Sequence, residues 1–215
     1  MGNMHTQVDE HIMGFLAEKT VTEDAFSAEL RRAALAAGLP EIHIAPEQAA
    51  FLQQLMHTMA AKTVVEVGTL GGYSALALAR GTAKDGRVIS FEIEPAYADF
   101  ARQWIEKSDQ SGRIEVVIGP AVDGLAELPA ASVDAVFLDA DKIGYVAYLE
   151  HSMRILRPGG TLLADNVLAG GHIATGDTET AVAIQAFLDT AQQTPNLQGV
   201  VLPLGDGLYF GVKQG

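Results

Sequence analysis

The sequence contains no cysteine in its 215 residues. This absence excludes a disulfide, a thiolate metal site and a catalytic thiol. It is typical of a protein from a reducing compartment, so we expect a cytoplasmic location. The chain also lacks an apolar run of the roughly 18 residues that a membrane helix requires. We therefore expect neither a membrane span nor a membrane partner.

Positive charge is scarce as well. Lys and Arg together number 14 against 27 Asp and Glu, which gives a net charge of −13. A surface that binds nucleic acid needs a basic footprint, so we expect no nucleic-acid partner. The same imbalance disfavours a polyanionic substrate such as a CoA ester. Hydrophobic residues make up 48% of the chain and charged residues 19%, which is typical of a globular protein.

Strand-like and helical stretches alternate from residue 63 onward. This alternation predicts an α/β, Rossmann-like, doubly wound and mostly parallel sheet. The last two strand-like runs meet at Gly205-Asp206-Gly207 as a hairpin, so one terminal strand at the edge should be antiparallel. A loop is expected at Leu168–Asp177. The expected strands are Thr63–Val67, Arg87–Phe91, Ile114–Ile118, Val133–Leu138, Thr161–Ala164, Leu197–Leu202 and Leu208–Val212, and the intervening helices are Gly72–Arg80, Pro95–Lys107, Val122–Leu128, Tyr145–Leu156 and Glu179–Thr190.

We expect residues 1–60 to form a helical lead-in. Apolar residues recur at helical spacing in Asp9–Ala17 and Glu23–Ala37, and Pro46 begins a third helix that extends to about Met59. We expect these helices to lie across the mouth of the sheet and to contribute to the substrate site. The length fits a single domain over residues 1–215.

A glycine turn follows the first expected strand. Gly68 and Gly71 are separated by two residues, whereas the dinucleotide fingerprint requires one. Glu66 precedes the turn and suits an amine or hydroxyl donor better than a pyrophosphate. A nicotinamide-dependent oxidoreductase of related fold stays an alternative. The turn places backbone N–H groups near a bound ligand at the start of a helix.

Acidic residues follow the other strands at the edge where such sheets bind ligands. Glu92 ends the second strand, about twenty residues after the glycine turn, where an acid typically accepts hydrogen bonds from ribose hydroxyls. The alternative for Glu92 is a helix cap, which Glu94 fills more naturally. Asp139 ends the fourth strand, and Asp165-Asn166 ends the fifth.

The last three of these residues form a candidate metal site. Strands four and five should be neighbours, so Asp139, Asp165 and Asn166 are expected to converge. Two carboxylates and an amide oxygen suit a hard cation such as Mg²⁺, or Mn²⁺ or Ca²⁺. The alternative is that each Asp caps the helix that follows it.

Together these segments resemble the metal-dependent class I O-methyltransferases that use S-adenosylmethionine, the caffeoyl-CoA and catechol O-methyltransferase group. The matching segments run from Ile44 to Lys213 and include Ala45-Pro46-Glu47-Gln48, Val65-Glu66-Val67-Gly68-Thr69, Gly72-Tyr73-Ser74, Gly119-Pro120-Ala121, Phe137-Leu138-Asp139-Ala140-Asp141-Lys142, Asp165-Asn166-Val167-Leu168 and Leu202-Pro203-Leu204-Gly205-Asp206-Gly207.

The resemblance implies methyl transfer from S-adenosylmethionine to a phenolic hydroxyl of a small vicinal diol, by a protein that is a homodimer. Lys142 stands where the family places its catalytic base, and Asp139 acts in catalysis as well as in metal binding. The implied metal ligands are Asp139, Asp165 and Asn166, and the implied cofactor residues are Ile44, Glu66, Gly68, Thr69, Ser74, Glu92, Ala121 and Asp141.

The sequence departs from the family on the acceptor side. Ala169-Gly170-Gly171-His172 replaces a segment that often begins with Trp, and Gln185 stands where an Arg is usual. These departures predict a roomier acceptor pocket and put a CoA-thioester substrate in doubt. His172 lies beside the expected site loop and is either a substrate contact or a solvated residue. A non-catalytic protein that binds S-adenosylmethionine is the second alternative; the metal trio and Lys142 disfavour it, because binding alone needs neither.

Overall fold

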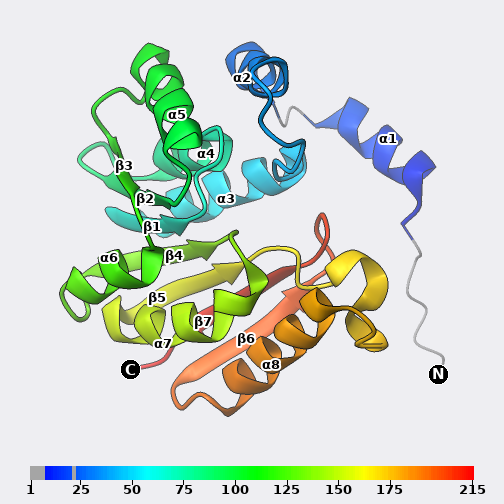
Figure 1. The fold of residues 1–215 in the computed structure, drawn as a ribbon, viewed down its shortest axis with the longest axis vertical. Helices are drawn as coiled ribbons and strands as arrows, with labels where there is room; N and C mark the ends of the chain where they lie inside the picture. The colour runs from blue at the N-terminus through cyan, green and yellow to red at the C-terminus, as the bar shows by residue number, and fades with distance from the viewer. Residues whose placement is uncertain (1–7, 21–22) are drawn as a thin grey trace.

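The computed structural model describes residues 8–20 and 23–215. Its centre is a seven-stranded sheet with the order β3-β2-β1-β4-β5-β7-β6 (Figure 1). Strands β1 to β5 pair in parallel, and β7 is antiparallel to both of its neighbours. This topology confirms the doubly wound prediction. The strands are β1 (Thr63–Val67), β2 (Arg87–Glu92), β3 (Ile114–Ile118), β4 (Val133–Leu138), β5 (Leu156–Ala164), β6 (Leu197–Leu202) and β7 (Leu208–Lys213).

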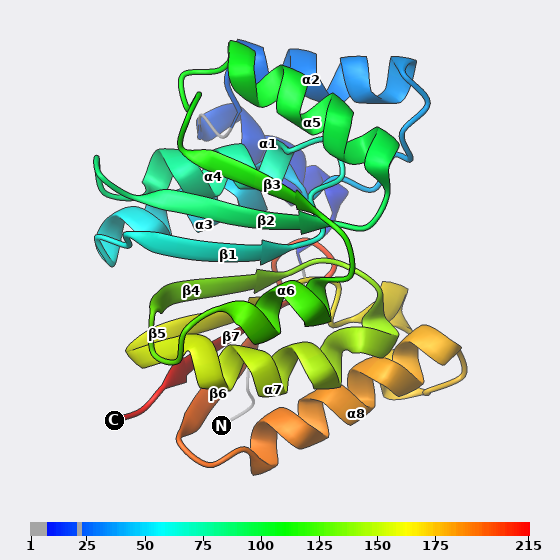
Figure 2. The same ribbon diagram turned by 60° about the vertical axis from the view of Figure 1, so that its left-hand side comes forward.

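Helices cover both faces of the sheet (Figures 1 and 2). On one face α3 packs against α4, with α5 alongside; on the other face α7 packs between α6 and α8. The two layers follow from right-handed crossovers that turn to opposite faces on either side of β1. The helices are α1 (Glu10–Lys19), α2 (Ala25–Ala36), α3 (Pro46–Thr58), α4 (Tyr73–Gly81), α5 (Pro95–Lys107), α6 (Ala121–Glu127), α7 (Tyr145–Ile155) and α8 (Glu179–Gln193), with short 3-10 helices η1 (Lys142–Gly144) and η2 (Ala169–Ala174).

Three details differ from expectation. The antiparallel strand β7 lies inside the sheet, between β5 and β6, so the edge strand is β6. Strand β5 begins at Leu156 and not at Thr161, because Leu156 already pairs with Val133 before a shift of register. The segment expected as a loop contains η2, whose Gly170 and Gly171 have positive φ.

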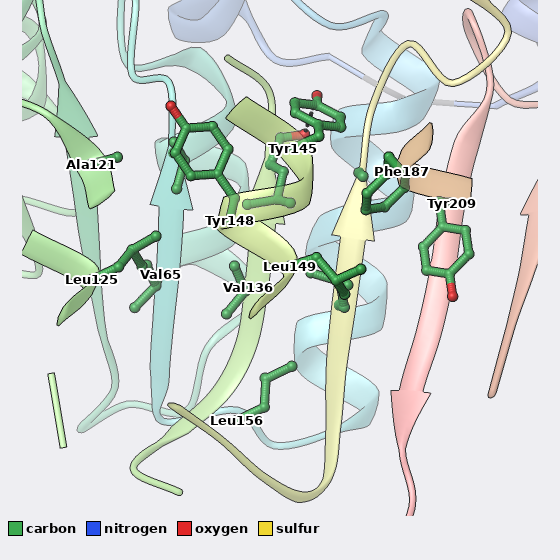
Figure 3. Close-up of a cluster of buried hydrophobic side chains, with 14 of the residues drawn as sticks. Val65, Ala121, Leu125, Val136, Tyr145, Tyr148, Leu149, Leu156, Phe187 and Tyr209 are labelled. Atoms are coloured by element: carbon green, nitrogen blue, oxygen red, sulfur yellow. Dashed lines mark hydrogen bonds between the residues drawn. The ribbon is translucent and has the colours of Figure 1, made fainter. Parts of the chain in front are cut away.

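The core on the α7 face holds a chain of aromatic side chains. Tyr145 and Phe187 meet edge to face with ring centroids 5.4 Å apart, and Phe187 meets Tyr209 at 5.3 Å (Figure 3). Such contacts between α7, α8 and β7 add to the stability gained from burial. They hold the N-terminus of α7, and with it the end of β4, in a fixed position.

Of the three N-terminal helices, α3 reaches the carboxyl end of the sheet through Gln48 in its first turn, which donates to Asp165. Helices α2 and α5 meet through Phe26 and Trp104, whose rings lie 5.5 Å apart. Helix α1 keeps Phe15 and Leu16 exposed at 55% and 45%. The segment between α2 and α3 also reaches the mouth of the sheet, where Ile42, His43 and Ile44 line the cavity described below. Residues 1–7 and 21–22 of the expected lead-in lie outside the described part of the chain. None of the described helices is long and apolar enough to cross a membrane.

Candidate active site

The glycine turn after β1 brings the chain against the end of β4. Gly68 has φ +100°, and a Cβ at this position would collide with the carbonyl group of Asp139. Asp139 in turn donates its backbone N–H to Val67 O at 2.8 Å. Leu70 and Gly72 also have positive φ, 48° and 85°, so the chain turns sharply into α4. The predicted cofactor turn and the predicted catalytic acid are therefore in backbone contact.

A cavity of about 670 Å³ opens above this turn. This volume lies within the range of small-molecule and cofactor sites. The cavity is lined by every predicted cofactor residue except Glu66, and also by Asp139, Asn166 and Lys142. Among the lining residues that sequence reasoning did not single out are Ile42, His43, Tyr73, Phe91, Ile93, Tyr97, Val122 and Tyr148.

Glu66 lies fully buried beneath the cavity. Its Oε2 accepts a hydrogen bond of 2.5 Å from Ser90 Oγ, which also meets Thr69 Oγ1 at 2.5 Å. Burial raises the pKa of Glu66 to about 8, while Ser74 and Ser90 oppose the shift. Because the Thr69 hydroxyl is engaged below the turn, Thr69 faces the cavity mainly with its backbone.

Two buried polar atoms next to the cavity lack a partner. Among the described residues these are Glu66 Oε1 and His43 Nε2. Burial, followed by the charge of Arg31, lowers the pKa of His43. An unpaired buried polar group costs free energy, so a ligand that supplies the missing partner gains affinity. Sequence reasoning missed His43, although its position next to Ile44 was a signal.

Glu92 holds the glycine turn in addition to lining the cavity. Its Oε2 accepts the backbone N–H of Leu70 at 2.7 Å, and its Oε1 accepts that of Glu94 at 2.9 Å. The side chain is only 7% exposed. Glu94 instead caps α5, where its Oε1 accepts the N–H of Ala96. The carboxylate of Glu92 can still offer its remaining lone pairs to hydroxyl groups in the cavity.

The structure brings the two predicted metal-binding carboxylates together. Asp165 follows β5 and donates its backbone N–H to Leu138 O at 2.9 Å. Burial, followed by the charge of Asp139, raises the pKa of Asp165 to about 6. Burial also raises the pKa of Asp139, which Lys142 opposes. Asn166 adopts φ 59° and lines the cavity beside them.

Lys142, in η1, contacts Asp139 of this pair. Its Nζ lies 3.3 Å from Asp139 Oδ1 and donates to the Tyr145 hydroxyl at 2.8 Å. That hydroxyl is buried and lies 3.0 Å from Leu138 O and 3.1 Å from Asp165 O, so it can donate to these carbonyl groups. Tyr145 thereby orients the ammonium group of Lys142 toward the ends of β4 and β5.

Asp141 also lines the cavity and is tied to η1 and α7. Its Oδ2 accepts the N–H of Gly144 at 2.8 Å, and its Oδ1 accepts the hydroxyl of Tyr148 at 2.7 Å. Tyr148 lies one turn after Tyr145, a spacing that could have identified it as a second aromatic residue of the site.

No group of three or more His, Cys, Asp or Glu side chains in residues 8–20 and 23–215 could hold a metal ion. The predicted trio has two carboxylates and one amide, so any metal bound here would rely on Asn166. His172 lies in η2, where its Nδ1 meets Asp177 Oδ1 at 2.8 Å. It is not among the cavity-lining residues.

The chain belongs to the O-methyltransferase family. The model of this family matches residues 17–214. The chain is 39% identical over 189 residues to the catechol O-methyltransferase of Mycobacterium tuberculosis. This alignment covers 87% of this chain and 86% of that protein. It is 34% identical over 219 residues to the catechol O-methyltransferase of Niastella koreensis. That alignment covers 97% of this chain and 99% of the relative.

The fold also matches a solved structure of a family member. The O-methyltransferase from Bacillus cereus in complex with SAH superimposes with a TM-score of 0.88. It is 30% identical, and the match covers 95% of this chain and 97% of that chain.

The raised pKa of the buried Glu66 carboxyl group can be tested through the pH dependence of stability. Because the folded-state pKa of about 8 exceeds the ordinary 4.5, the folded protein holds an extra proton between these values. Stability is therefore lost as the pH rises through this window, by up to about 1.4 kcal/mol per pH unit. The variant Glu66→Gln carries no charge there and should gain in melting temperature over the wild type as the pH rises from 5 to 8.5, in cofactor-free protein.

Glu115→Gln is the matched control, because it removes an exposed carboxylate from β3. Its melting-temperature difference from the wild type should not grow over the same range. A difference for Glu66→Gln that stays flat from pH 5 to 8.5 would show that Glu66 is ionised in the folded protein.

Proposed function

We propose that this protein transfers a methyl group from S-adenosylmethionine to a phenolic hydroxyl of a catechol-like small molecule, with a divalent metal ion at Asp139, Asp165 and Asn166. The observation that carries the proposal is the juxtaposition of two sets of residues in one cavity. The glycine turn with Glu92 forms one wall, and Asp139, Asn166 and Lys142 form another.

The chemistry of the cavity fits S-adenosylmethionine. This cofactor supplies an electrophilic methyl group on a sulfonium ion, and it carries an amine and two ribose hydroxyls as donors. Glu66 Oε1 lacks a hydrogen-bond partner, and Glu92 faces the cavity with a carboxylate. The complex of the Bacillus cereus relative with SAH supports this part of the proposal.

The oxygen atoms of Asp139, Asp165 and Asn166 are suitable ligands for a divalent cation. Asp139 and Asp165 are buried carboxylates whose pKa values are raised by burial, and the charge of Asp139 adds to the shift of Asp165. A cation beside them would relieve both effects. Carboxylate and amide oxygens are ligands that Mg²⁺ and Mn²⁺ accept. When bound, such an ion supplies positive charge that lowers the pKa of an adjacent hydroxyl and holds vicinal oxygens together.

Lys142 is proposed to move the proton. A phenol has a pKa of about 10 and is a poor nucleophile when protonated. The Lys142 Nζ, in its amine form, accepts the hydroxyl proton, while Tyr145 keeps it directed toward the acceptor. The resulting phenolate oxygen bonds to the methyl carbon, and the carbon–sulfur bond breaks to leave a neutral thioether. The walls of the cavity contribute alignment of the two reactants.

The acceptor class rests on the chemistry of the site and on the relatives. Two relatives are named catechol O-methyltransferase, and neighbouring hydroxyls match a centre that holds two oxygens. The family match favours methyl transfer over the nicotinamide-dependent alternative. A protein that binds the cofactor without catalysis would not need Lys142 beside Asp139. The homodimer expected from the resemblance stays a prediction.

Incubation with S-adenosylmethionine, Mg²⁺ and catechol should give a product heavier by one methyl group, as measured by mass spectrometry. Resorcinol is the matched control, since its two hydroxyls are not adjacent and cannot share one centre. Equal methylation of both phenols would contradict the vicinal-diol proposal, and methylation of neither would remove catechols from the candidate acceptors.

Glu92→Ala should weaken binding of S-adenosylhomocysteine by roughly 1–3 kcal/mol, measured by calorimetry. The loss has two sources, because the variant removes an acceptor for ribose and releases the Leu70 N–H that shapes the glycine turn. Glu94→Ala is the control on the adjacent helix cap. Equal affinity of the Glu92 variant and the wild type would assign Glu92 to the scaffold alone.

Chelation and two substitutions separate metal binding from proton transfer. EDTA should abolish activity, and Mg²⁺ or Mn²⁺ should restore it.

Asp139→Ala should lower both activity and apparent metal affinity. Lys142→Ala should retain metal and cofactor binding yet lose about 10²–10⁴-fold in kcat at neutral pH. Higher pH should partly rescue this variant, because hydroxide then removes the proton.

Rescue by pH should be much weaker for Asp139→Ala, in which the centre itself is damaged. Lys84→Ala, on the exposed surface, controls for the loss of a positive charge. Identical pH profiles and metal dependence for the Asp139 and Lys142 variants would make Lys142 a structural partner of the site. Full turnover in EDTA would reject the metal.

A further inference from the structure

A buried glutamine reaches one of the proposed metal ligands from a distant part of the chain. Gln48 lies in the first turn of α3 and is 3% exposed. Its Nε2 donates to Asp165 Oδ1 at 2.5 Å, although the two residues are 117 positions apart. Asp165 is itself 2% exposed, so this hydrogen bond is shielded from water.

The orientation of the Gln48 amide is determined by its second contact. Its Oε1 accepts the backbone N–H of Ala45 at 3.1 Å. A backbone N–H can only donate, so the amide oxygen must face Ala45 and the NH₂ group must face Asp165. The turn between β6 and β7 packs over the same amide, since a Cβ on Gly205 would collide with it.

This arrangement constrains a carboxylate that could otherwise rotate. The terminal torsion of an Asp side chain has broad, weakly separated minima, so a carboxylate alone is poorly oriented. Gln48 engages Oδ1 of Asp165, and no second side chain of the described residues donates to this carboxylate. A residue that hydrogen-bonds to a metal ligand orients that ligand and tunes the affinity for the metal.

We infer that Gln48 is a positioning residue that fixes the Asp165 carboxylate so that a single oxygen is presented to the divalent cation. This inference rests on the metal ion of the proposed function.

The test is binding of Mn²⁺ to the purified protein, followed by electron paramagnetic resonance without substrate. Gln48→Met keeps the length of the side chain and removes both hydrogen bonds. It should weaken Mn²⁺ binding by about 10–100-fold, the range for such partners of metal ligands. Binding of S-adenosylhomocysteine should match the wild type. In assays, the Mn²⁺ concentration for half-maximal activity should rise by the same factor, with KM for S-adenosylmethionine unchanged.

Gln54→Met is the matched control, because it places the same substitution on the exposed side of α3. Gln48→Asn is the second variant: it retains an amide but shortens its reach to Asp165, and it should also weaken Mn²⁺ binding. Wild-type Mn²⁺ affinity in either Gln48 variant overturns the inference. So does a joint loss of Mn²⁺ binding, cofactor binding and thermal stability in both variants, which would make Gln48 purely structural.

The wild-type measurement distinguishes a missing metal site from a missing role of Gln48. Absence of Mn²⁺ binding by the wild type overturns the metal in the proposed function, and with it the role of Gln48. Binding by the wild type that is unaltered in the Gln48 variants overturns only the role of Gln48 and leaves the metal in place.

Discussion

The backbone contact between Gly68 and Asp139 is the constraint on which the rest of the site depends. Parallel strands β1 and β4 end side by side, and only a residue without a Cβ lets the turn after β1 pass against the carbonyl of Asp139. This contact places the cofactor turn next to the proposed metal and proton-transfer residues. Glu92 then holds the turn in that position through the N–H of Leu70.

Most of the sheet and the position of the site could be predicted from the sequence. β-branched runs between helical stretches define the strands, and the side chains at their carboxyl ends must share one edge of a parallel sheet. The sequence alone therefore predicts that Asp139 and Asp165 are neighbours. The two residues are neighbours if β4 and β5 pair, and the topology confirms this pairing.

Contacts between distant segments could not be predicted in the same way. The hydrogen bond from Gln48 to Asp165 depends on how α3 packs, and periodicity in the sequence contains no signal for it. The two backbone hydrogen bonds of Glu92 depend on the shape of the turns after β1 and β2. The position of β7 inside the sheet likewise follows from its pairing with β5, whereas a hairpin alone indicates only that β6 and β7 are neighbours.

The charges of the site explain why it would need cationic partners. Glu66, Asp139 and Asp165 are all carboxyl groups whose pKa values are raised, with burial as the first cause. Each therefore costs free energy when ionised, and Lys142 offsets this in part for Asp139 and Asp165. In the proposed function the sulfonium and amine of the cofactor and the divalent ion bring positive charge to these groups. Each cationic partner would thereby lower the cost of ionising the carboxylates that it approaches.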